Sequence, residues 1–359
     1  MAFKKPSVKK TKTNLSSLRI YLRAVPKFGK TTLFRDMVLE EYNGNPEKGL
    51  LVGVGNETGY AYLDELNTTH VETWADMEEL KKWLIKGKKS GEHEIELVAF
   101  DTADEIIPLA ETEVCRLSQI ATGKPCDSIN KAFGGYGKGQ DKVKEIVKKY
   151  FNDLYKAGFG ITSIAHTKVK NIIEKGREDS EGYQVLTSNL PNTYESIFAD
   201  IFDCVVTGVV DKDVVDGKLM GSTRKLYFRD NCFVTAGCRL PGNSVPEYMI
   251  FEGDDTAKEF IDVLKNAMKS AIKKPVSDEE FKTLQEVEKQ ESVEQLDTVI
   301  DEMDKKPEKT TEELINEIKQ LSVDPNKKRL LLEQMKASGK KISEFSVEEL
   351  EEIIKVMNN

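Results

Sequence analysis

The sequence contains no long uninterrupted apolar stretch. In its 359 residues no segment approaches the roughly 18 uncharged apolar residues that a membrane-spanning helix needs. The N-terminal stretch MAFKKPSVKKTKTN also lacks the apolar core of a secretory signal peptide. We therefore expect a soluble protein of the cytoplasm that has no membrane partner.

Cysteine and histidine are scarce. The chain has three histidines and no CxxC pair, and its five cysteines are Cys115, Cys126, Cys204, Cys232 and Cys238. An odd number of cysteines without paired spacing argues against a disulfide framework and against a structural zinc site. We expect reduced thiols.

The acidic excess is confined to the C-terminal part of the chain. The net charge of −9 arises after Pro275, where 22 acidic residues accompany 13 basic ones, and the preceding part is neutral. This shift predicts a domain boundary near Pro275. The first 12 residues contain five lysines, which predicts a flexible basic arm at 1–14 followed by a core at 15–275.

Two different segments follow the boundary. Residues 276–308 are rich in glutamate and poor in apolar side chains, so we expect an acidic linker with transient helix. Residues 309–359 repeat a helix-capping pattern with apolar residues at helical spacing, such as Leu314, Ile318 and Leu321. They predict a small all-α module of about three helices.

The stretch AVPKFGKTT at 24–32 fits most of the phosphate-binding pattern GxxxxGK[ST]. Ala24 stands where the first glycine belongs. The preceding residues, LRIYLRAV, have the pattern of a strand, and the following TTLFRDMVLEEY has the spacing of a helix. This context favours a phosphate loop over a surface turn flanked by lysines.

The pattern assigns roles to the loop residues. Lys30 would reach the β- and γ-phosphates of ATP, and Thr31 would hold Mg²⁺. The predicted nucleotide-binding residues of the loop are Pro26, Lys27, Phe28, Gly29, Lys30, Thr31 and Thr32.

A strand that ends in aspartate supplies a second element of a nucleotide site. The segment IELVAFDTADE at 95–105 contains a continuous apolar run, as a strand buried on both faces would, and Asp101 follows it. Ligands of open α/β sheets bind at the carboxyl edge of the strands. Together with the loop, this segment predicts that Asp101 positions Mg²⁺.

Two further predicted strands end in polar side chains. Glu57 follows the strand in GLLVGVGNETGY, and it either polarises the attacking water or only caps the next helix. His166 ends FGITSIAH, and it either contacts the γ-phosphate or has a structural role. The residues alone leave both pairs of alternatives open.

This order of elements resembles the RecA-type ATPase core, and more closely the compact phage nucleotide-binding proteins of the AAA/RecA type that act in single-strand annealing or recombination. The similarity covers about residues 15–255. It implies an α/β fold, a RecA-like P-loop NTPase core with a mostly parallel sheet, to which the all-α C-terminal module is added. It also implies that Lys30 and Glu57 are catalytic, that Thr31 and Asp101 hold Mg²⁺, and that His166 reports the nucleotide state to the DNA-binding loop.

The resemblance directs attention to two loops as sites for single-stranded DNA. The first, within 123–154, is rich in glycine, lysine and aromatic residues, and the second, 166–191, is basic in its first half. Alternatively, the first is a flexible loop over the nucleotide and the second is a β-hairpin with ordinary solvated lysines. The candidate DNA contacts are Lys131, Phe133, Tyr136 and Lys138 in the first loop and Lys168, Lys170, Lys175 and Arg177 in the second.

An arginine near the C-terminal end of the core completes the expected site. Arg224, Arg229 and Arg239 lie near the end of the core, and we prefer Arg239 as a catalytic arginine finger that reaches a neighbouring protomer. This role requires a homo-oligomer. Ala24 and the lack of an extended N-terminal helix are departures from the family that leave the oligomer geometry open.

The sequence therefore predicts an ATP- and Mg²⁺-dependent ATPase that binds single-stranded DNA in phage recombination or replication, in the cytoplasm of the host cell. The acidic C-terminal region would contact a phage or host replication or recombination protein, or would only aid solubility. Two alternatives are a nucleotide-gated loader with little hydrolysis and an NTPase without a nucleic-acid role.

Overall fold

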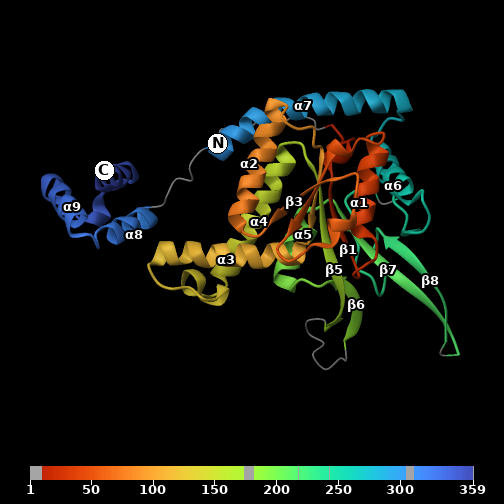
Figure 1. Cartoon of the computed structure of the whole chain (residues 1–359), viewed down its shortest axis with the longest axis horizontal. Helices are drawn as coiled ribbons and strands as arrows, with labels where there is room; N and C mark the ends of the chain where they lie inside the picture. Colours follow the sequence, from red (N-terminus) through yellow and green to blue (C-terminus); the bar gives the residue numbers. More distant parts are fainter. Residues whose placement is uncertain (1–9, 174–181, 217, 242, 305–310, 359) are drawn as a thin grey trace. The chain divides into compact units, whose positions relative to one another are not determined.

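Figure 1 shows the computed structural model, which describes residues 10–173, 182–216, 218–241, 243–304 and 311–358. The described residues fall into two units, one drawn from 1–109 and 147–300 and the other from 110–146 and 301–359. Lys175, Arg177 and the first nine residues of the expected basic arm lie outside the described part.

A mixed sheet forms the centre of the first unit. Its strands are β1 (Arg19–Ala24), β2 (Gly49–Val54), β3 (Asn67–Val71), β4 (Leu97–Asp101), β5 (Gly160–Ile172), β6 (Tyr183–Ser188), β7 (Cys204–Val215), β8 (Lys218–Tyr227), β9 (Gly237–Cys238) and β10 (Tyr248–Ile250). Their order is β10-β8-β7-β1-β5-β4-β2-β3, with β6 beside β5 and β9 beside β7. All neighbours from β7 to β3 are parallel, so their carboxyl ends meet at one edge.

Helices connect these strands, and further helices follow the last strand in the chain. The α-helices are α1 (Lys30–Glu41), α2 (Trp74–Ser90), α3 (Ala103–Thr122), α4 (Lys138–Lys156), α5 (Asn192–Ile201), α6 (Thr256–Ser270), α7 (Asp278–Asp304), α8 (Thr311–Leu321), α9 (Pro325–Ser338) and α10 (Val347–Asn358). Short 3₁₀ turns are η1 (Leu15–Ser17), η2 (Pro46–Lys48), η3 (Gly59–Tyr62), η4 (Ile129–Gly134) and η5 (Ile342–Glu344). No helix in the described ranges has the length and apolar character needed to cross a bilayer.

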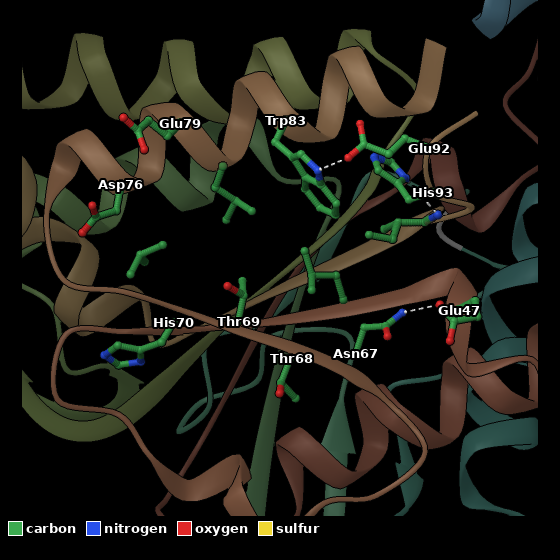
Figure 2. Close-up of a pocket in the computed structure, with 14 residues that line it drawn as sticks. Glu47, Asn67, Thr68, Thr69, His70, Asp76, Glu79, Trp83, Glu92 and His93 are labelled. Carbon is green, nitrogen blue, oxygen red and sulfur yellow. Dashed lines mark hydrogen bonds between the residues drawn. The ribbon is translucent and has the colours of Figure 1, made fainter. Parts of the chain in front are cut away.

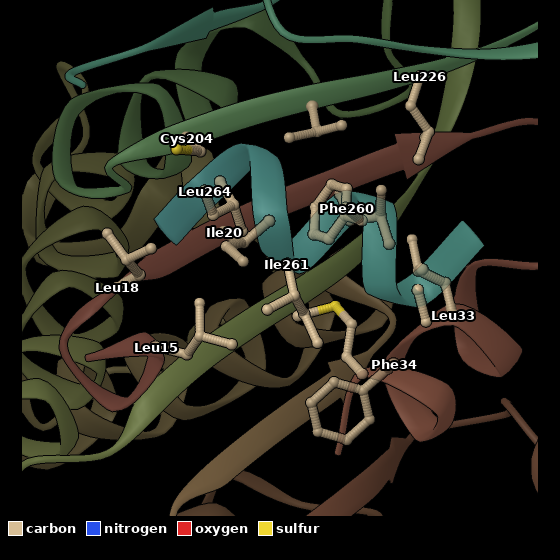
Figure 3. Packing of buried hydrophobic residues seen from close by; sticks show 14 of the residues in the cluster. Leu15, Leu18, Ile20, Leu33, Phe34, Cys204, Leu226, Phe260, Ile261 and Leu264 are labelled. Atoms are coloured by element: carbon tan, nitrogen blue, oxygen red, sulfur yellow. The ribbon is translucent and has the colours of Figure 1, made fainter. Parts of the chain in front are cut away.

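Helices cover both faces of the sheet. Successive side chains of β1 point to opposite faces, and Ile20 lies in the cluster that α1 and α6 close with Phe34 and Phe260 (Figure 3). On the other face Tyr21 stacks on Phe198 of α5 at 4.9 Å between ring centroids. Because β4 is buried throughout, its continuous apolar run is explained, and the predicted α/β fold with a mostly parallel sheet is confirmed.

Residues 278–304 differ from the expected linker. They form the single helix α7, and its Phe281 is buried in the main core cluster. Glu288 of α7 accepts hydrogen bonds from Thr13 N at 2.7 Å and from Asn14 Nδ2 at 3.2 Å, so residues 13 and 14 are not a free arm. The charged composition of this segment predicted only transient helix. A few apolar and hydrogen-bonding residues are nevertheless enough to hold α7 against the core.

The strand that was expected to end at His166 continues to Ile172. It pairs with β6 in antiparallel register from Thr167 to Ile172, so the described part of the segment 166–191 is the β-hairpin that had been the alternative to a long irregular loop.

The second unit contains the predicted C-terminal helices. α8, α9 and α10 share a hydrophobic cluster of Leu314, Ile318, Leu331, Phe345, Leu350, Ile353 and Met357. The helical character of this region is therefore confirmed, and residues 311–358 have an apolar core of their own.

Candidate nucleotide-binding site

The loop between β1 and α1 turns at Gly29. Its φ of 108° is a value that side chains rarely adopt, and a Cβ there would lie 3.1 Å from the ring of Phe251. Glycine is therefore required at this position. Ala24 is the last residue of β1, so replacing the first glycine of the pattern leaves the turn intact.

Lys30 opens α1, and its side chain crosses the loop. The residue is only 7% exposed, and its Nζ donates hydrogen bonds to the carbonyl oxygens of Ala24 and Val25, both at 3.1 Å. Burial lowers the pKa of Lys30, while the carboxylate of Asp101 acts in the opposite direction. A helix N-terminus and a lysine thus converge on one loop, which is an arrangement that binds phosphate.

Thr31 and Asp101 meet at the carboxyl edge of the sheet. Thr31 Oγ1 donates a hydrogen bond to Asp101 Oδ2 at 2.9 Å. Asp101 is 5% exposed, and burial raises its pKa to about 6, against the effect of the Thr31 hydrogen bond. The charge of Glu57 raises this pKa further. A cation beside Asp101 would therefore favour its ionised form.

These two oxygen side chains fit Mg²⁺. In the described ranges no group of three or more His, Cys, Asp or Glu side chains is arranged to hold a metal ion. Magnesium commonly binds through one or two protein oxygens, completed by phosphate and water. Thr31 and Asp101 would therefore hold the ion together with a nucleotide.

His166 lies level with the end of β1, because its Cα pairs with that of Ala24. Its Nδ1 lies 3.3 Å from Asp104 Oδ2, and its backbone N–H donates to the same oxygen at 2.9 Å. Burial would raise the pKa of Asp104, but the hydrogen bonds from His166 outweigh it and hold that pKa below its usual value.

Asn189, which follows β6, closes this cluster. Its backbone N–H donates to His166 O at 2.8 Å, and its Nδ2 donates to Asp104 Oδ1 at 3.4 Å. The sequence indicated neither Asp104 nor Asn189. Asp104 lies in the first turn of α3, and its partners His166 and Asn189 are 62 and 85 positions away in the chain, so no local spacing singles it out.

Glu57 combines features of both roles considered for it. Its Oε1 accepts a hydrogen bond from Gly59 N at 2.8 Å, as the capping alternative requires. Its charge also acts on Lys30 and Asp101, as a position near the phosphate loop requires. Capping and catalysis are therefore compatible at this residue.

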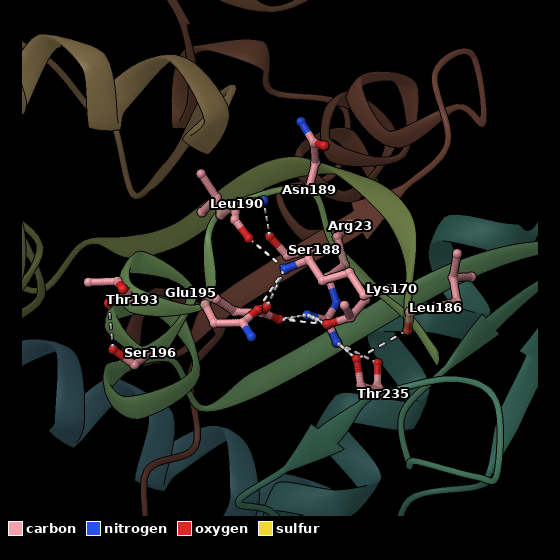
Figure 4. A network of polar contacts seen from close by, with 12 residues as sticks. Arg23, Lys170, Leu186, Ser188, Asn189, Leu190, Thr193, Glu195, Ser196 and Thr235 are labelled. Carbon is pink, nitrogen blue, oxygen red and sulfur yellow. Dashed lines mark hydrogen bonds and ion pairs between the residues drawn. The ribbon is translucent and has the colours of Figure 1, made fainter. Parts of the chain in front are cut away.

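A buried polar network joins β1 to the β5–β6 hairpin (Figure 4). Arg23, one residue before Ala24, donates to Glu195 of α5 at 2.5 Å and to Thr187 of β6 at 3.3 Å. Lys170 of β5 pairs with the same glutamate at 3.4 Å. The predicted DNA contact Lys170 is thus engaged inside the protein, whereas Lys168 is exposed.

The first candidate DNA loop belongs to the second unit. Tyr136 is fully exposed at 101%, and Lys138 is also exposed. Phe133 is half-buried, and Lys131 forms an ion pair with a neighbouring aspartate at 3.0 Å. Of the four predicted contacts, Tyr136 and Lys138 are therefore the most available.

Arg239 lies at the sheet edge opposite the phosphate loop. Its backbone N–H donates to Asp203 O at 2.8 Å, and Asp203 N donates to the carbonyl oxygen of Arg19, where β1 begins. Its guanidinium pairs with Asp203 at 3.3 Å. Any contact of Arg239 with a phosphate therefore has to involve another copy of the chain.

Arg224 of β8, by contrast, lies beside the loop of its own chain. Its Nη1 donates to Phe28 O at 3.1 Å. The guanidinium of Arg229 instead contacts Val245 O at 2.7 Å. The sequence offered no reason to prefer Arg224, because this contact joins residues 196 positions apart.

A cavity of about 700 Å³ lies elsewhere, between α2 and the edge strand β3 (Figure 2). Trp83 and four carboxylates, those of Glu47, Asp76, Glu79 and Glu92, line it, and its described lining contains no lysine or arginine. Like charges repel, so this cavity does not suit a nucleotide's phosphates. The loop between β1 and α1 is the better candidate.

The comparisons with known proteins agree with this geometry. A family model described as an AAA domain matches residues 16–240, which is more than half of the chain. A search of curated proteins finds no match. The matched range includes the loop, Glu57, Asp101 and His166 and ends before α6. The chain therefore belongs to the AAA domain family, whose members are P-loop NTPases.

Proposed function

We propose that this protein binds and hydrolyses ATP with Mg²⁺ and that the nucleotide state controls its binding to single-stranded DNA, in a phage recombination or replication pathway. The observation that carries the proposal is the meeting of Lys30, Thr31 and Asp101 at the carboxyl edge of the sheet. This edge is where ligands of open α/β sheets bind.

The chain's own groups account for the proposed chemistry. Lys30 and the N–H groups at the start of α1 would bind the phosphates. Thr31 and Asp101 would hold Mg²⁺, which neutralises phosphate charge when it is bound. Glu57 would orient the attacking water and accept its proton at a carboxylate oxygen. His166, held by Asp104, would hydrogen-bond to the terminal phosphate.

Single-stranded DNA is the partner that the exposed loop suits. A base can stack on an exposed aromatic ring, and lysines can neutralise phosphates, without any requirement for sequence. Tyr136, Lys138 and Lys168 offer these groups at the surface. Asn189 links the β5–β6 hairpin to Asp104. A ligand that contacts His166 would therefore act on that hairpin through Asp104 and Asn189.

We further propose that the protein acts as a homo-oligomer in the host cytoplasm, with Arg239 reaching a neighbouring copy's nucleotide. The C-terminal helices would contact a replication or recombination protein. One observation favours the loader alternative, in which hydrolysis is negligible. Glu57 Oε1 already accepts the hydrogen bond of Gly59 N–H, so only Oε2 is left to orient a water.

Nucleotide-dependent DNA binding tests this function. Fluorescence anisotropy with a labelled oligothymidylate would compare ATP, ADP and no nucleotide. We expect tighter binding with ATP, and a loss of about fivefold or more in Tyr136→Ala, because stacking contributes ~1 to 3 kcal/mol per base. Tyr62→Ala is the control, since Tyr62 is 96% exposed but lies outside both loops. Equal affinity in all three nucleotide states, or equal losses in both variants, would refute the proposed role.

A further inference from the structure

Arg224 is fixed against the backbone of the phosphate loop. Its backbone is held within β8, where Arg224 O accepts from Phe251 N at 2.8 Å and Arg224 N donates to Glu252 Oε1 at 3.2 Å. From there its Nη1 donates to Phe28 O at 3.1 Å. The guanidinium therefore reaches the loop from a strand that is itself anchored.

Phe251 supports the same contact from the side. Its ring stacks on that of Phe28 with 4.8 Å between centroids and 18° between planes. The guanidinium carbon of Arg224 lies 5.1 Å from the Phe251 centroid. Both phenylalanines are almost fully buried, so the three side chains form one packed layer behind the loop.

This layer acts on a single peptide unit. The carbonyl of Phe28 and the N–H of Gly29 belong to the same planar trans peptide, so they point in opposite directions. A hydrogen bond that holds Phe28 O toward Arg224 therefore turns Gly29 N–H away from Arg224. A phosphate loop needs inward-pointing N–H groups to bind its ligand.

We propose that Arg224 is a positioning residue for nucleotide binding, which holds the Phe28–Gly29 peptide so that Gly29 N–H faces the nucleotide's phosphates. The inference rests on the proposed nucleotide-binding function and concerns the arginine's own chain. It differs from the arginine-finger role expected of Arg239, which requires a neighbouring copy.

The test uses the full chain and three variants. Arg224→Gln removes the charged donor, Arg224→Lys keeps a cation without the planar guanidinium, and Arg229→Gln is the matched control. Arg229 also binds a backbone carbonyl, that of Val245, but away from the loop. The readouts are the Kd for a fluorescent ATP analogue, KM and kcat for ATP, and the melting temperature without nucleotide.

We expect Arg224→Gln to weaken binding of the analogue and to raise KM about tenfold, with kcat within about threefold, because a charged hydrogen bond that acts on ground state and transition state alike is lost. Arg224→Lys should recover part of the affinity, with a KM between those of the wild type and Arg224→Gln, and Arg229→Gln should bind as the wild type does. A general loss of structure would not produce this separation of KM from kcat or the recovery by lysine.

Wild-type affinity in Arg224→Gln, or equal losses in Arg224→Gln and Arg229→Gln, would overturn the inference. If Arg224→Gln does not fold, Arg224→Lys must raise KM more than Arg229→Lys does, or the inference is again overturned. Lys30→Ala separates this result from the wider proposal. If the wild type binds the analogue no better than Lys30→Ala, the nucleotide-binding function itself fails.

Discussion

At the scale of single residues, Asp101 is a buried carboxylate whose ionised form is needed only when a cation is present. Its pKa of about 6 lies above the value of 3.8 expected in the unfolded chain. As the pH rises from about 4, the unfolded chain releases this proton first, so ionisation of Asp101 increasingly opposes folding until about pH 6. Without nucleotide, the charge therefore lowers stability at neutral pH.

Asp101→Asn should consequently stabilise the nucleotide-free protein. We expect a gain of about 2 to 3 kcal/mol in the free energy of unfolding at about pH 8, and about half of that at about pH 5. The same variant should lose Mg²⁺-dependent nucleotide binding. Urea unfolding at both pH values measures the gain, with Asp64→Asn as control because that side chain is 87% exposed. Lower stability of Asp101→Asn at pH 8 would contradict this account.

Glu57→Gln separates capping from catalysis. The glutamine oxygen can still accept the hydrogen bond from Gly59 N–H, so the local turn should persist, but the general base is lost. We expect kcat for ATP to fall by about 10²- to 10⁴-fold with nucleotide affinity retained. Steady-state rates and analogue binding measure the two effects. An unchanged kcat would assign Glu57 to capping alone.

The local pattern predicted Lys30, Thr31 and Asp101, and the structure brings these three together. The local pattern could not reveal Asp104, Asn189 or Arg224, because their contacts join residues far apart in the chain. A motif describes backbone geometry over a few residues, whereas such side-chain partners depend on the register of distant strands.

At the scale of elements, the amino-acid composition of α7 did not predict that this helix packs on the core. Its apolar positions are few, yet Phe281 reaches the main core, and Glu288 binds the N-terminal segment. Burial would raise the pKa of Glu288, but hydrogen bonds from Ser17 and Thr13 outweigh it and hold that pKa below its usual value. Its stabilising effect is thus present above the unfolded pKa and is lost as the pH falls further.

Glu288→Ala should therefore destabilise the protein. It leaves the backbone N–H of Thr13 and the side chains of Thr13, Asn14 and Ser17 without their shared acceptor. We expect a loss of about 2 to 4 kcal/mol in the free energy of unfolding at neutral pH, from urea titration. Glu291→Ala, on the exposed side of the same helix, should lose less than ~1 kcal/mol, since exposed ion pairs contribute little. Equal losses would show that Glu288 does not anchor the N-terminal segment to α7.

The strands illustrate how much pattern alone can predict. Continuous apolar runs identified β2 and β4, because strands buried on both faces need no alternation, whereas β1 was predicted from an alternating run that includes Arg19 and Arg23. The extension of β5 past His166 was left open between a β-hairpin and a long irregular loop, because it depends on pairing with β6, whose register the sequence does not show.

At the scale of the whole molecule, the AAA domain match ends at residue 240, whereas the described chain continues through α6 to α10. The candidate nucleotide site, with Lys30, Thr31 and Asp101, lies within the matched range. The helices α8 to α10 have their own apolar core, so the chain carries a separate element that the family does not define. The charge distribution of the sequence predicted a domain boundary near Pro275. The structure shows that α7, which follows Pro275, still packs on the main core through Phe281.

The most direct test of the central claim is steady-state ATP hydrolysis by the full chain, with and without single-stranded DNA, beside Lys30→Ala. Because Lys30 lies across the phosphate loop, its loss should abolish hydrolysis. We predict a wild-type rate that single-stranded DNA increases, and a variant rate at background under both conditions. A wild-type rate equal to that of Lys30→Ala, with DNA and without it, would contradict the account.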